Sequence, residues 1–302
     1  MVSDKTMNKK RLINLNYLNI LEIVGEGAIE LLQGQLTCDM GKVSSKNPTQ
    51  GAICNVKGRI ISSFIVVAPN DENTNKFWLI GPELMMKKTQ NVLKKYSPFY
   101  QVDISILSDK DIYGANNDAL ESFFPDLNFN DNQYIHHSIL VLGYLDKKIR
   151  LVITNKGDNI FKDSSEISSD LSDWHLDNFL IKDVEITEDL SEKLTPHEIN
   201  YDVSERVDFE KGCYTGQEIV ARMHYRAKSL PRLYLTEGSN DLAETNMSVE
   251  DSAGRRIGSV VKVLKHQKGN YALISIKADE LEEDYKTSDG NTLLTIKNNP
   301  TI

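Results

Sequence analysis

The most informative part of the sequence contains the run Lys211-Gly212-Cys213-Tyr214-Thr215-Gly216-Gln217-Glu218. Thr215 is followed three positions later by Glu218. This is the spacing of a capping box, in which two side chains satisfy backbone N–H groups at the start of a helix. An apolar stripe continues behind the box. The run therefore predicts a helix that begins at Gly216.

Cys213 lies just before this predicted helix. The unpaired N–H groups and the positive end of a helix dipole favour an anion at that place, and Lys211 adds a positive charge nearby. Both effects lower the pKa of a thiol from its usual value of about 8.5. Gly212 and Gly216 leave room for a ligand to approach the backbone. The run thus predicts a reactive thiol; the alternative is that Cys213 is a small buried core residue, as most free cysteines are.

The residues before this run have the pattern of a mixed α/β region. Helices are predicted over Gly27–Leu36, Glu83–Tyr96 and Tyr113–Phe124. Strands are predicted over Leu12–Val24 (in two short pieces), Gly51–Ala68 (a hairpin that turns at Lys57-Gly58-Arg59), Phe77–Ile80, Gln101–Leu107, Ile139–Leu145 and Ile149–Thr154. The predicted inner faces of the first two helices carry Ile29, Leu32 and Leu36, and then Leu84, Val92 and Leu93.

After Pro231 the pattern changes. Short β-rich segments separated by turns follow at Arg232–Thr236, Met247–Val249, Gly258–Leu264, Tyr271–Ile276 and Leu293–Ile296. Many short strands with turns between them are typical of a small β-barrel or sandwich. We therefore expect the last part of the chain to form one.

Composition is that of an ordinary globular protein and predicts a cytoplasmic location. The 302 residues are 40% hydrophobic and 26% charged, and this length favours two or three domains. No apolar stretch approaches the ~20 residues needed to span a bilayer, and Met1–Arg11 lacks the apolar segment of a secretory signal. The three cysteines, Cys38, Cys54 and Cys213, are widely spaced without a CxxC pair. They fit a reducing compartment and argue against a structural zinc site.

The charge balance limits the partners that the chain can have. A net charge of −9 disfavours non-specific binding to nucleic acid, because phosphate groups are neutralised by a surplus of Lys and Arg. One local surplus lies between Ile219 and Thr236, where Arg222, Arg226, Lys228 and Arg232 occur without an acidic residue. This segment is either a solvated basic face or a site for an anion such as a polyglutamate, a phosphate or RNA.

The run that ends at Glu218, together with Val220-Ala221-Arg222 and Arg226, resembles the signature of the YgfZ folate-binding family. Three further segments resemble elements of that family in the same order. They are Leu32-Gln33-Gly34-Gln35-Leu36-Thr37 with Asp39, Cys54-Asn55-Val56-Lys57-Gly58-Arg59, and Pro196 with Asn200. The resemblance covers roughly residues 12–235. The family includes bacterial tRNA-modification factors and a mitochondrial iron–sulfur assembly factor.

The resemblance implies an α+β fold like the glycine-cleavage T-protein, an aminomethyltransferase with three domains around a tetrahydrofolate pocket. It implies a folate-binding region over residues 1–230 and a C-terminal β-barrel over 231–302. The folate-binding region would consist of two intertwined α/β units, roughly 1–50 plus 135–230, and 51–134.

The resemblance also implies which residues form the site. Cys213 and Lys211 would be the catalytic pair, and the folate would contact Trp174, Asn200, Tyr214, Gln217, Glu218 and Arg222. For Trp174 the alternative is a tryptophan buried at a domain junction, and for Asn200 it is a residue that caps a turn. A second folate-contacting tryptophan of the family, near the N-terminus, has no counterpart here, because Tyr17-Leu18 occupies that neighbourhood.

Whether the chain is an enzyme depends on Ser62 and Ser63. A T-protein carries an acidic pair at the matching positions, and a hydroxyl cannot supply the negative charge that steadies a developing cation. The resemblance therefore implies an accessory factor that binds tetrahydrofolate and supports iron–sulfur enzymes, including those that modify tRNA. It implies no membrane and no sequence-specific nucleic-acid partner. A folate-dependent one-carbon transferase is the alternative, and a plain RNA-binding adaptor is disfavoured by the acidic charge balance.

The histidines predict no metal site. His136-His137, His175 and His197 have no partner at metal-ligand spacing along the sequence. His224 is interpreted as a surface residue of the predicted helix.

Overall fold

The computed structural model describes residues 11–44, 46–69, 75–125, 133–136, 139–143, 149–158, 161, 167–227, 229–238, 244–277, 281–290 and 292–297. For residues 133–136 and 149 it describes the backbone alone. The N-terminal residues 1–10, His137 and Lys228, which the sequence analysis mentions, lie outside the described residues.

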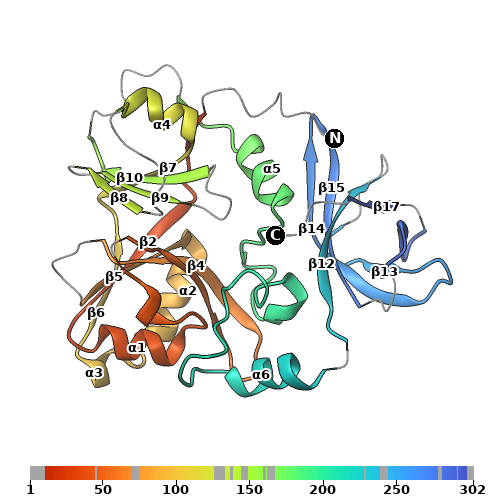
Figure 1. The fold of residues 1–302 in the computed structure, drawn as a ribbon, viewed down its shortest axis with the longest axis horizontal. Coiled ribbons are helices and arrows are strands. Elements are labelled where there is room, and N and C mark those ends of the chain that lie inside the picture. Colours follow the sequence, from red (N-terminus) through yellow and green to blue (C-terminus); the bar gives the residue numbers. More distant parts are fainter. Residues whose placement is uncertain are drawn as a thin grey trace. The chain divides into compact units, whose positions relative to one another are not determined.

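One sheet has six strands in the order β11-β1-β7-β10-β9-β8 (Figure 1). Its strands are β1 (Leu12–Asn14), β7 (Lys110–Asn116), β8 (Gln133–His136), β9 (Ile139–Gly143), β10 (Ile149–Asn155) and β11 (Ile167–Ser168). The short pair β1 and β11 is parallel, and the other pairs are antiparallel. Buried apolar residues of this sheet, among them Leu12, Val141 and Val152, form one core with Phe161. The predicted pairing of the two strands after Ile139 is confirmed.

The predicted helix over Tyr113–Phe124 is wrong in its first part. Residues up to Asn116 form β7, which is bonded to β1 on one side and to β10 on the other. Only then does α4 (Asn117–Phe123) begin, and the Asn116 side chain accepts a hydrogen bond from the Ala119 N–H as its cap. Pairing on both edges of β7 outweighs the local helical pattern, because tertiary context routinely overrides propensity.

The second sheet has five strands in the order β3-β4-β5-β2-β6. Its strands are β2 (Leu18–Val24), β3 (Thr49–Cys54), β4 (Ile60–Val67), β5 (Lys76–Pro82) and β6 (Asp103–Leu107). The predicted hairpin and the two-part strand before Val24 are confirmed. Helix α2 (Glu83–Leu93) packs on β2, β5 and β6 (Figure 1). Shorter elements in this part of the chain are α1 (Ala28–Gln35), the 3-10 turn η2 (Met40–Lys42) and α3 (Ser97–Tyr100).

Two residues predicted to face the core lie outward instead. Leu84 is 58% exposed, because the inner face of α2 is set by Met85, Met86, Thr89 and Leu93. Ile29 is 38% exposed, whereas Leu32 and Leu36 are buried as predicted. In both helices the surrounding packing decides which side faces the core, and the apolar pattern alone leaves that side ambiguous.

Contacts divide the chain into two units. The first comprises Met1–Leu32, Asp39–Gln50 and Phe64–Trp174, and the second comprises Gln33–Cys38, Gly51–Ser63 and His175–Ile302. The chain therefore passes from one unit to the other within α1, between Cys38 and Asp39, and within β3, β4 and α5 (Ser172–Leu180). The domain boundaries implied by the family resemblance stay a prediction.

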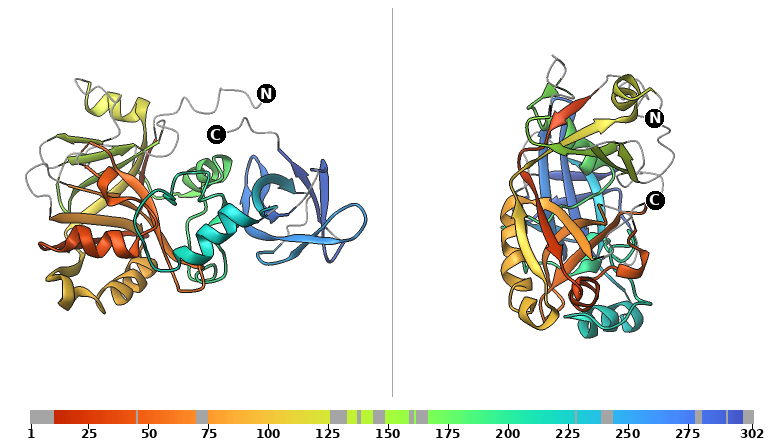
Figure 2. Two further views of the ribbon diagram at one scale, coloured as in Figure 1. Left: turned by 60° about the horizontal axis from the view of Figure 1, so that its bottom comes forward. Right: turned by 90° about the vertical axis from the view of Figure 1, so that its left-hand side faces the viewer.

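The second unit ends in a closed six-stranded barrel of order β12-β15-β14-β13-β16-β17, drawn in blue in Figure 2. Its strands are β12 (Arg232–Gly238), β13 (Ser248–Glu250), β14 (Arg256–His266), β15 (Gly269–Ile276), β16 (Asp284–Thr287) and β17 (Leu293–Ile296). The predicted barrel is confirmed. Strand β16 was not predicted, because only Tyr285 and Thr287 of this short polar segment point inward.

Before the barrel, the second unit contains the 3-10 turn η3 (Pro196–Ile199) and helix α6 (Gln217–Arg226). The turn η3 packs on β12, β15 and α6. In the described part of the chain, none of the helices has the length and apolar character needed to cross a membrane.

The close approach of Trp174 to β7 generates a prediction about stability. A Cβ added at Gly114 would lie 2.5 and 2.6 Å from two atoms of the Trp174 ring, whereas a Cβ at Gly34, in the last turn of α1, would meet nothing within 4 Å. We expect Gly114→Ala to lower the free energy of unfolding by about 1–3 kcal/mol. The matched control Gly34→Ala should leave it equal or raise it by up to about 1 kcal/mol. Urea unfolding measures both, and equal effects of the two substitutions would contradict the packing described.

Candidate functional site

Lys211 is buried and bonded to the carbonyl end of α1. Lys211 is 8% exposed. Its Nζ donates hydrogen bonds to the carbonyl oxygens of Gln33 and Leu36 at 2.7 and 2.6 Å. Helix α1 has no basic residue in its own last turn. A cation placed there satisfies free carbonyls and complements the negative end of the helix dipole. Lys211 thus ties the Cys213 segment to α1, and its assignment as a catalytic residue stays a prediction.

The helix after Cys213 begins one residue later than predicted and without a capping box. Gly216 is its N-cap, with φ of 86°, and no side chain caps the helix. Thr215 instead donates its N–H to the Gly34 carbonyl at 3.3 Å, and its hydroxyl donates to Gln35 Oε1 at 3.3 Å. The predicted capping box is wrong because the left-handed turn at Gly216 directs Thr215 toward the end of α1.

Gly216 also lets the turn of the β3–β4 hairpin approach the start of α6. A Cβ at Gly216 would lie 2.4 Å from the Asn55 carbonyl oxygen and 3.3 Å from Gly58. Gly58 has φ of 69°, and a Cβ there would lie 3.0 Å from the Ile219 side chain. Only glycine fits both positions without strain. Three of the segments that carry the family resemblance therefore meet beside Cys213.

Tyr214 is a buried residue with an unsatisfied hydroxyl. It is 6% exposed, and its Oη has no hydrogen-bond partner among the described residues. The Lys211 ammonium lies 5.1 Å from the centre of its ring. Burial, with a smaller contribution from Cys54, raises the pKa of Tyr214, so the hydroxyl stays protonated at neutral pH. A buried hydroxyl without a partner is costly, which makes this atom available to a ligand.

The three thiols lie in different environments. Cys213 is exposed, and Cys38 and Cys54 are buried at 0% and 1% exposure. Burial raises the pKa of the Cys54 thiol to about 12. Cys38 and Cys54 thus lie in packed parts of the fold, and the alternative of a buried Cys213 is wrong.

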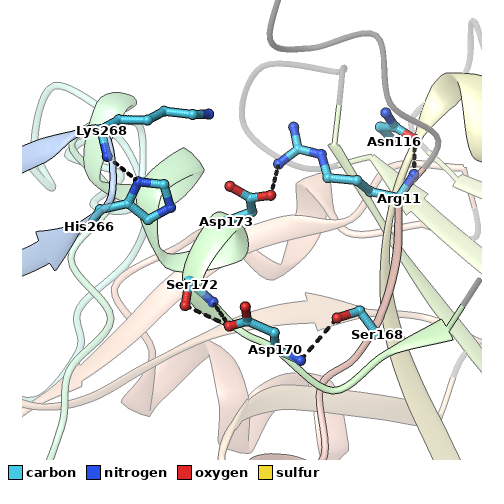
Figure 3. Close-up of polar contacts among 8 residues, drawn as sticks. All are labelled: Arg11, Asn116, Ser168, Asp170, Ser172, Asp173, His266 and Lys268. Atoms are coloured by element: carbon cyan, nitrogen blue, oxygen red, sulfur yellow. Dashed lines mark hydrogen bonds and ion pairs between the residues drawn. The ribbon is translucent and has the colours of Figure 1, made fainter.

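Trp174 lies in the first turn of α5, where a set of polar contacts holds the chain (Figure 3). Asp170 Oδ1 accepts from the N–H and the hydroxyl of Ser172 at 2.9 and 2.5 Å. The Asp173 carboxylate lies 3.9 Å from the Arg11 guanidinium. The backbone N–H of Arg11 donates to Asn116 Oδ1 at 3.0 Å. These contacts fix the start of α5 and with it the direction of the indole.

The Trp174 side chain is packed inside the fold. It is 3% exposed, and its Nε1–H donates to Tyr17 Oη at 3.0 Å. Tyr17 belongs to the pair Tyr17-Leu18, which on the family resemblance occupies the neighbourhood of a second folate-contacting tryptophan. Tyr17 and Gly114, which Trp174 contacts, belong like Trp174 to the first unit. Its role as a folate contact stays a prediction.

Asn200 supports the backbone of β12. It adopts φ of 58° at the end of η3, and its side chain exchanges two hydrogen bonds of 3.1 Å with the N–H and the carbonyl of Leu233. This arrangement matches the alternative that Asn200 caps a turn. A folate contact from this amide stays a prediction.

The remaining predicted folate contacts lie on the first turns of α6. Glu218 and Arg222 are exposed and four residues apart, which places them on one face of the helix, and Gln217 is half-buried. The structure brings these residues together with Cys213 and Tyr214 along one continuous segment, but it places Trp174 and Asn200 on other elements.

Sequence analysis missed one cluster of potential ligands. One side-chain atom each from His197, Asp202 and His224 lies within 4.8 Å of the other two. No spacing along the sequence pairs His197 with His224, but the two residues meet in space because η3 and α6 pack together although they are distant in sequence. Burial is the largest cause that lowers the His197 pKa; Asp202 opposes it, and Arg232 and His224 add to it. Spacing along the chain carries no signal for such a cluster.

Comparison with known proteins supports the family resemblance. No family model matches the chain. The tRNA-modifying protein YgfZ of Aliivibrio fischeri strain ES114 is 29% identical over 277 residues, which cover 89% of this chain and 86% of that protein. The proteins of the same name from Shigella dysenteriae serotype 1 and Escherichia coli O127:H6 are each 25% identical over 299 residues, with 93% of this chain and 90% of those proteins covered. The resemblance to the YgfZ family is confirmed.

A solved structure supports the fold of this YgfZ-like chain. The glycine cleavage system aminomethyltransferase T from Bartonella henselae matches it with a TM-score of 0.75 and covers 95% of this chain and 84% of that one. The two sequences are 13% identical, so the match shows the fold alone. The predicted α+β, T-protein-like fold with a C-terminal β-barrel is confirmed.

The exposure of the thiols predicts the order in which the cysteines of this protein are alkylated. Iodoacetamide at neutral pH should label Cys213 in the native protein, because its sulfur is accessible. Cys54 should stay unlabelled until the protein is unfolded, because its thiol is buried and its pKa is raised to about 12. Mass spectrometry of peptides from native and urea-treated samples measures both. Equal labelling of Cys54 and Cys213 in the native protein would be inconsistent with the structure.

Proposed function

We propose that this chain is an accessory factor that binds a reduced folate, such as tetrahydrofolate, and supports the modification of tRNA. In this proposal Cys213 is the functional centre. The observation that carries it is the convergence of three family-like segments on one exposed thiol. Lys211 bonds to the end of α1, Thr215 bonds to Gly34 and Gln35, and Gly216 contacts the hairpin turn.

The names of the relatives support the tRNA part of the proposal. Each is named a tRNA-modifying protein, and its alignment covers about nine-tenths of this chain. We propose that the chain acts in the cytoplasm and acts on tRNA through iron–sulfur enzymes rather than by reading RNA itself. The net charge of −9 supports this indirect route, because direct binding to RNA requires a strong positive surface.

The folate part of the proposal is supported by the T-protein-like fold and by the Tyr214 segment. The unsatisfied Tyr214 hydroxyl and the exposed Glu218 and Arg222 are polar groups on the segment that follows Cys213 along the chain. A pterin carries several donors and acceptors and would need such groups to fix its orientation.

An aminomethyltransferase is the second candidate, because the matched solved structure is one. Two neutral side chains in β4 weigh against it. Ser62 and Ser63 are buried, and the Ser63 hydroxyl accepts a hydrogen bond from the Ile186 N–H at 3.2 Å. They supply no negative charge for a cationic transition state. Transfer of an aminomethyl group from a lipoyl carrier protein to tetrahydrofolate separates the two candidates, since only the transferase would turn over.

Titration with tetrahydrofolate tests folate binding. The chain has two tryptophans, and each lies on a different element, Trp78 in β5 and Trp174 in α5. We expect saturable quenching of tryptophan fluorescence in the wild type and in Trp78→Phe, and loss of most of that signal in Trp174→Phe. Trp174→Ala should also weaken binding measured by equilibrium dialysis by about 5- to 150-fold, equivalent to ~1–3 kcal/mol.

The matched pair of tryptophan variants makes this test decisive. The Nε1–H of Trp78 donates a hydrogen bond to Glu22 Oε2 at 2.8 Å. Replacement of Trp78 by Phe therefore controls for a general effect of losing a tryptophan. Absence of tetrahydrofolate binding in the dialysis experiment would rule out the folate part of the proposal. Binding that is equal in the wild type and in Trp174→Ala would rule out the assigned place of the ligand.

A further inference from the structure

The cluster of His197, Asp202 and His224 lies apart from the Cys213 segment in sequence and from every role proposed above. His197 comes from η3, Asp202 follows that turn, and His224 comes from the last turn of α6. All three belong to the second unit. One potential ligand atom from each lies within 4.8 Å of the others. Such a convergence of two imidazoles and a carboxylate is the donor set of many metal sites.

His197 is an unusual buried residue. It is 0% exposed, and neither of its ring nitrogens has a hydrogen-bond partner among the described residues. A buried polar atom that is left without a partner costs about 1–3 kcal/mol, and native structures contain few of them. Packing alone does not account for a histidine at this position, because an apolar residue would avoid this cost.

The distance between the side chains of His197 and Asp202 leaves room for a metal ion between them. Nε2 of His197 lies 3.9 Å from Oδ2 of Asp202, which is too long for a hydrogen bond. Metal–nitrogen and metal–oxygen bonds of about 2.1 Å each would span this gap through a bent ligand–metal–ligand angle. Tetrahedral ligands with such bonds lie about 3.4 Å apart, so the two side chains would have to move slightly closer together around a metal ion.

His224 is held in an orientation suited to the third position. Its ring stacks on Phe209 with centroids 3.8 Å apart and planes 18° apart. Its centroid lies 6.1 Å from that of His197, with the planes 31° apart. His224 is also accessible to solvent, so an ion could enter from its side.

Asp202 is oriented by a partner of its own. Its side chain is 2% exposed, and Nη1 of Arg232 donates to both of its oxygens at 2.8 Å. Each carboxylate oxygen has a second lone pair, so this contact leaves a position for a metal. Outer partners of this kind commonly orient the carboxylate ligands of metal sites. The positive charge of Arg232 lowers the affinity for a cation, so the site should bind less tightly than a closed structural zinc site.

We propose that His197, Asp202 and His224 form a binding site for one divalent first-row transition-metal ion such as Zn²⁺, Fe²⁺ or Co²⁺. Imidazole donors favour these ions over Mg²⁺ and Ca²⁺, which prefer oxygen ligands. Three protein ligands leave at least one coordination position for water or a substrate, which is the arrangement of catalytic rather than structural sites.

Cobalt binding to the untagged, full-length protein tests this inference. Co²⁺ is titrated in the absence of chelators and followed both by its visible d–d absorption and by equilibrium dialysis. We expect one ion per chain in the wild type, with Zn²⁺ competing for the same site and Mg²⁺ not competing. His224→Gln and Asp202→Asn should each weaken binding at least ten-fold.

Two controls separate this site from other ligands of the chain. Cys213→Ser removes the exposed thiol, and His266→Gln removes a histidine of β14 whose Nδ1 accepts from the Lys268 N–H at 3.1 Å. Both should bind Co²⁺ like the wild type. His197→Gln should abolish binding but alters a buried residue, so the conclusion depends on the solvent-accessible His224. Lack of stoichiometric binding in the wild type, binding that survives His224→Gln, or binding lost in Cys213→Ser would each overturn the inference.

Discussion

The ammonium group of Lys211 closes the carbonyl end of α1, and the rest of the Cys213 segment depends on this contact. Helix α1 supplies no basic residue of its own, so the cation comes from a residue that is 175 positions away from the Leu36 carbonyl. A buried ammonium is tolerated only where hydrogen bonds replace its water. Hydrogen bonds to a charged group contribute about 1.5–3 kcal/mol each. The Lys211 contacts therefore fix the position of the chain immediately before Cys213.

Two glycines complete this arrangement on the other side of the thiol. Gly216 turns the chain into α6 through a left-handed conformation, and both it and Gly58 admit a close approach of the hairpin. With Lys211 on one side and Gly216 on the other, Cys213 is held between two anchored points and remains exposed. The same anchors explain why the run around Cys213 is recognisable in sequence: a buried cation, a buried tyrosine and a left-handed glycine each tolerate few substitutes.

Much of the fold could be predicted from local patterns, and the failures have physical causes. The hairpin at Gly58 and the barrel strands carry strong turn and alternation signals. Residues 113–116 were assigned to a helix because only pairing with β1 and β10 makes them a strand. In the site, the sequence left open whether Cys213 is a reactive thiol or a buried core residue, and the structure shows it exposed. The predicted capping box is absent because Thr215 bonds to the end of α1. The histidine cluster was invisible because His197 and His224 meet only through the packing of η3 on α6.

The most direct test of the central claim is the level of thiolated tRNA nucleosides in a strain that lacks its own YgfZ relative. The strain is complemented with the wild type, Cys213→Ser or the neighbouring exposed control Glu210→Gln, and the protein levels are matched. We expect the wild type and Glu210→Gln to restore the nucleosides, and Cys213→Ser to leave them at the level of the empty strain. Full restoration by Cys213→Ser would contradict the assignment of Cys213 as the functional centre.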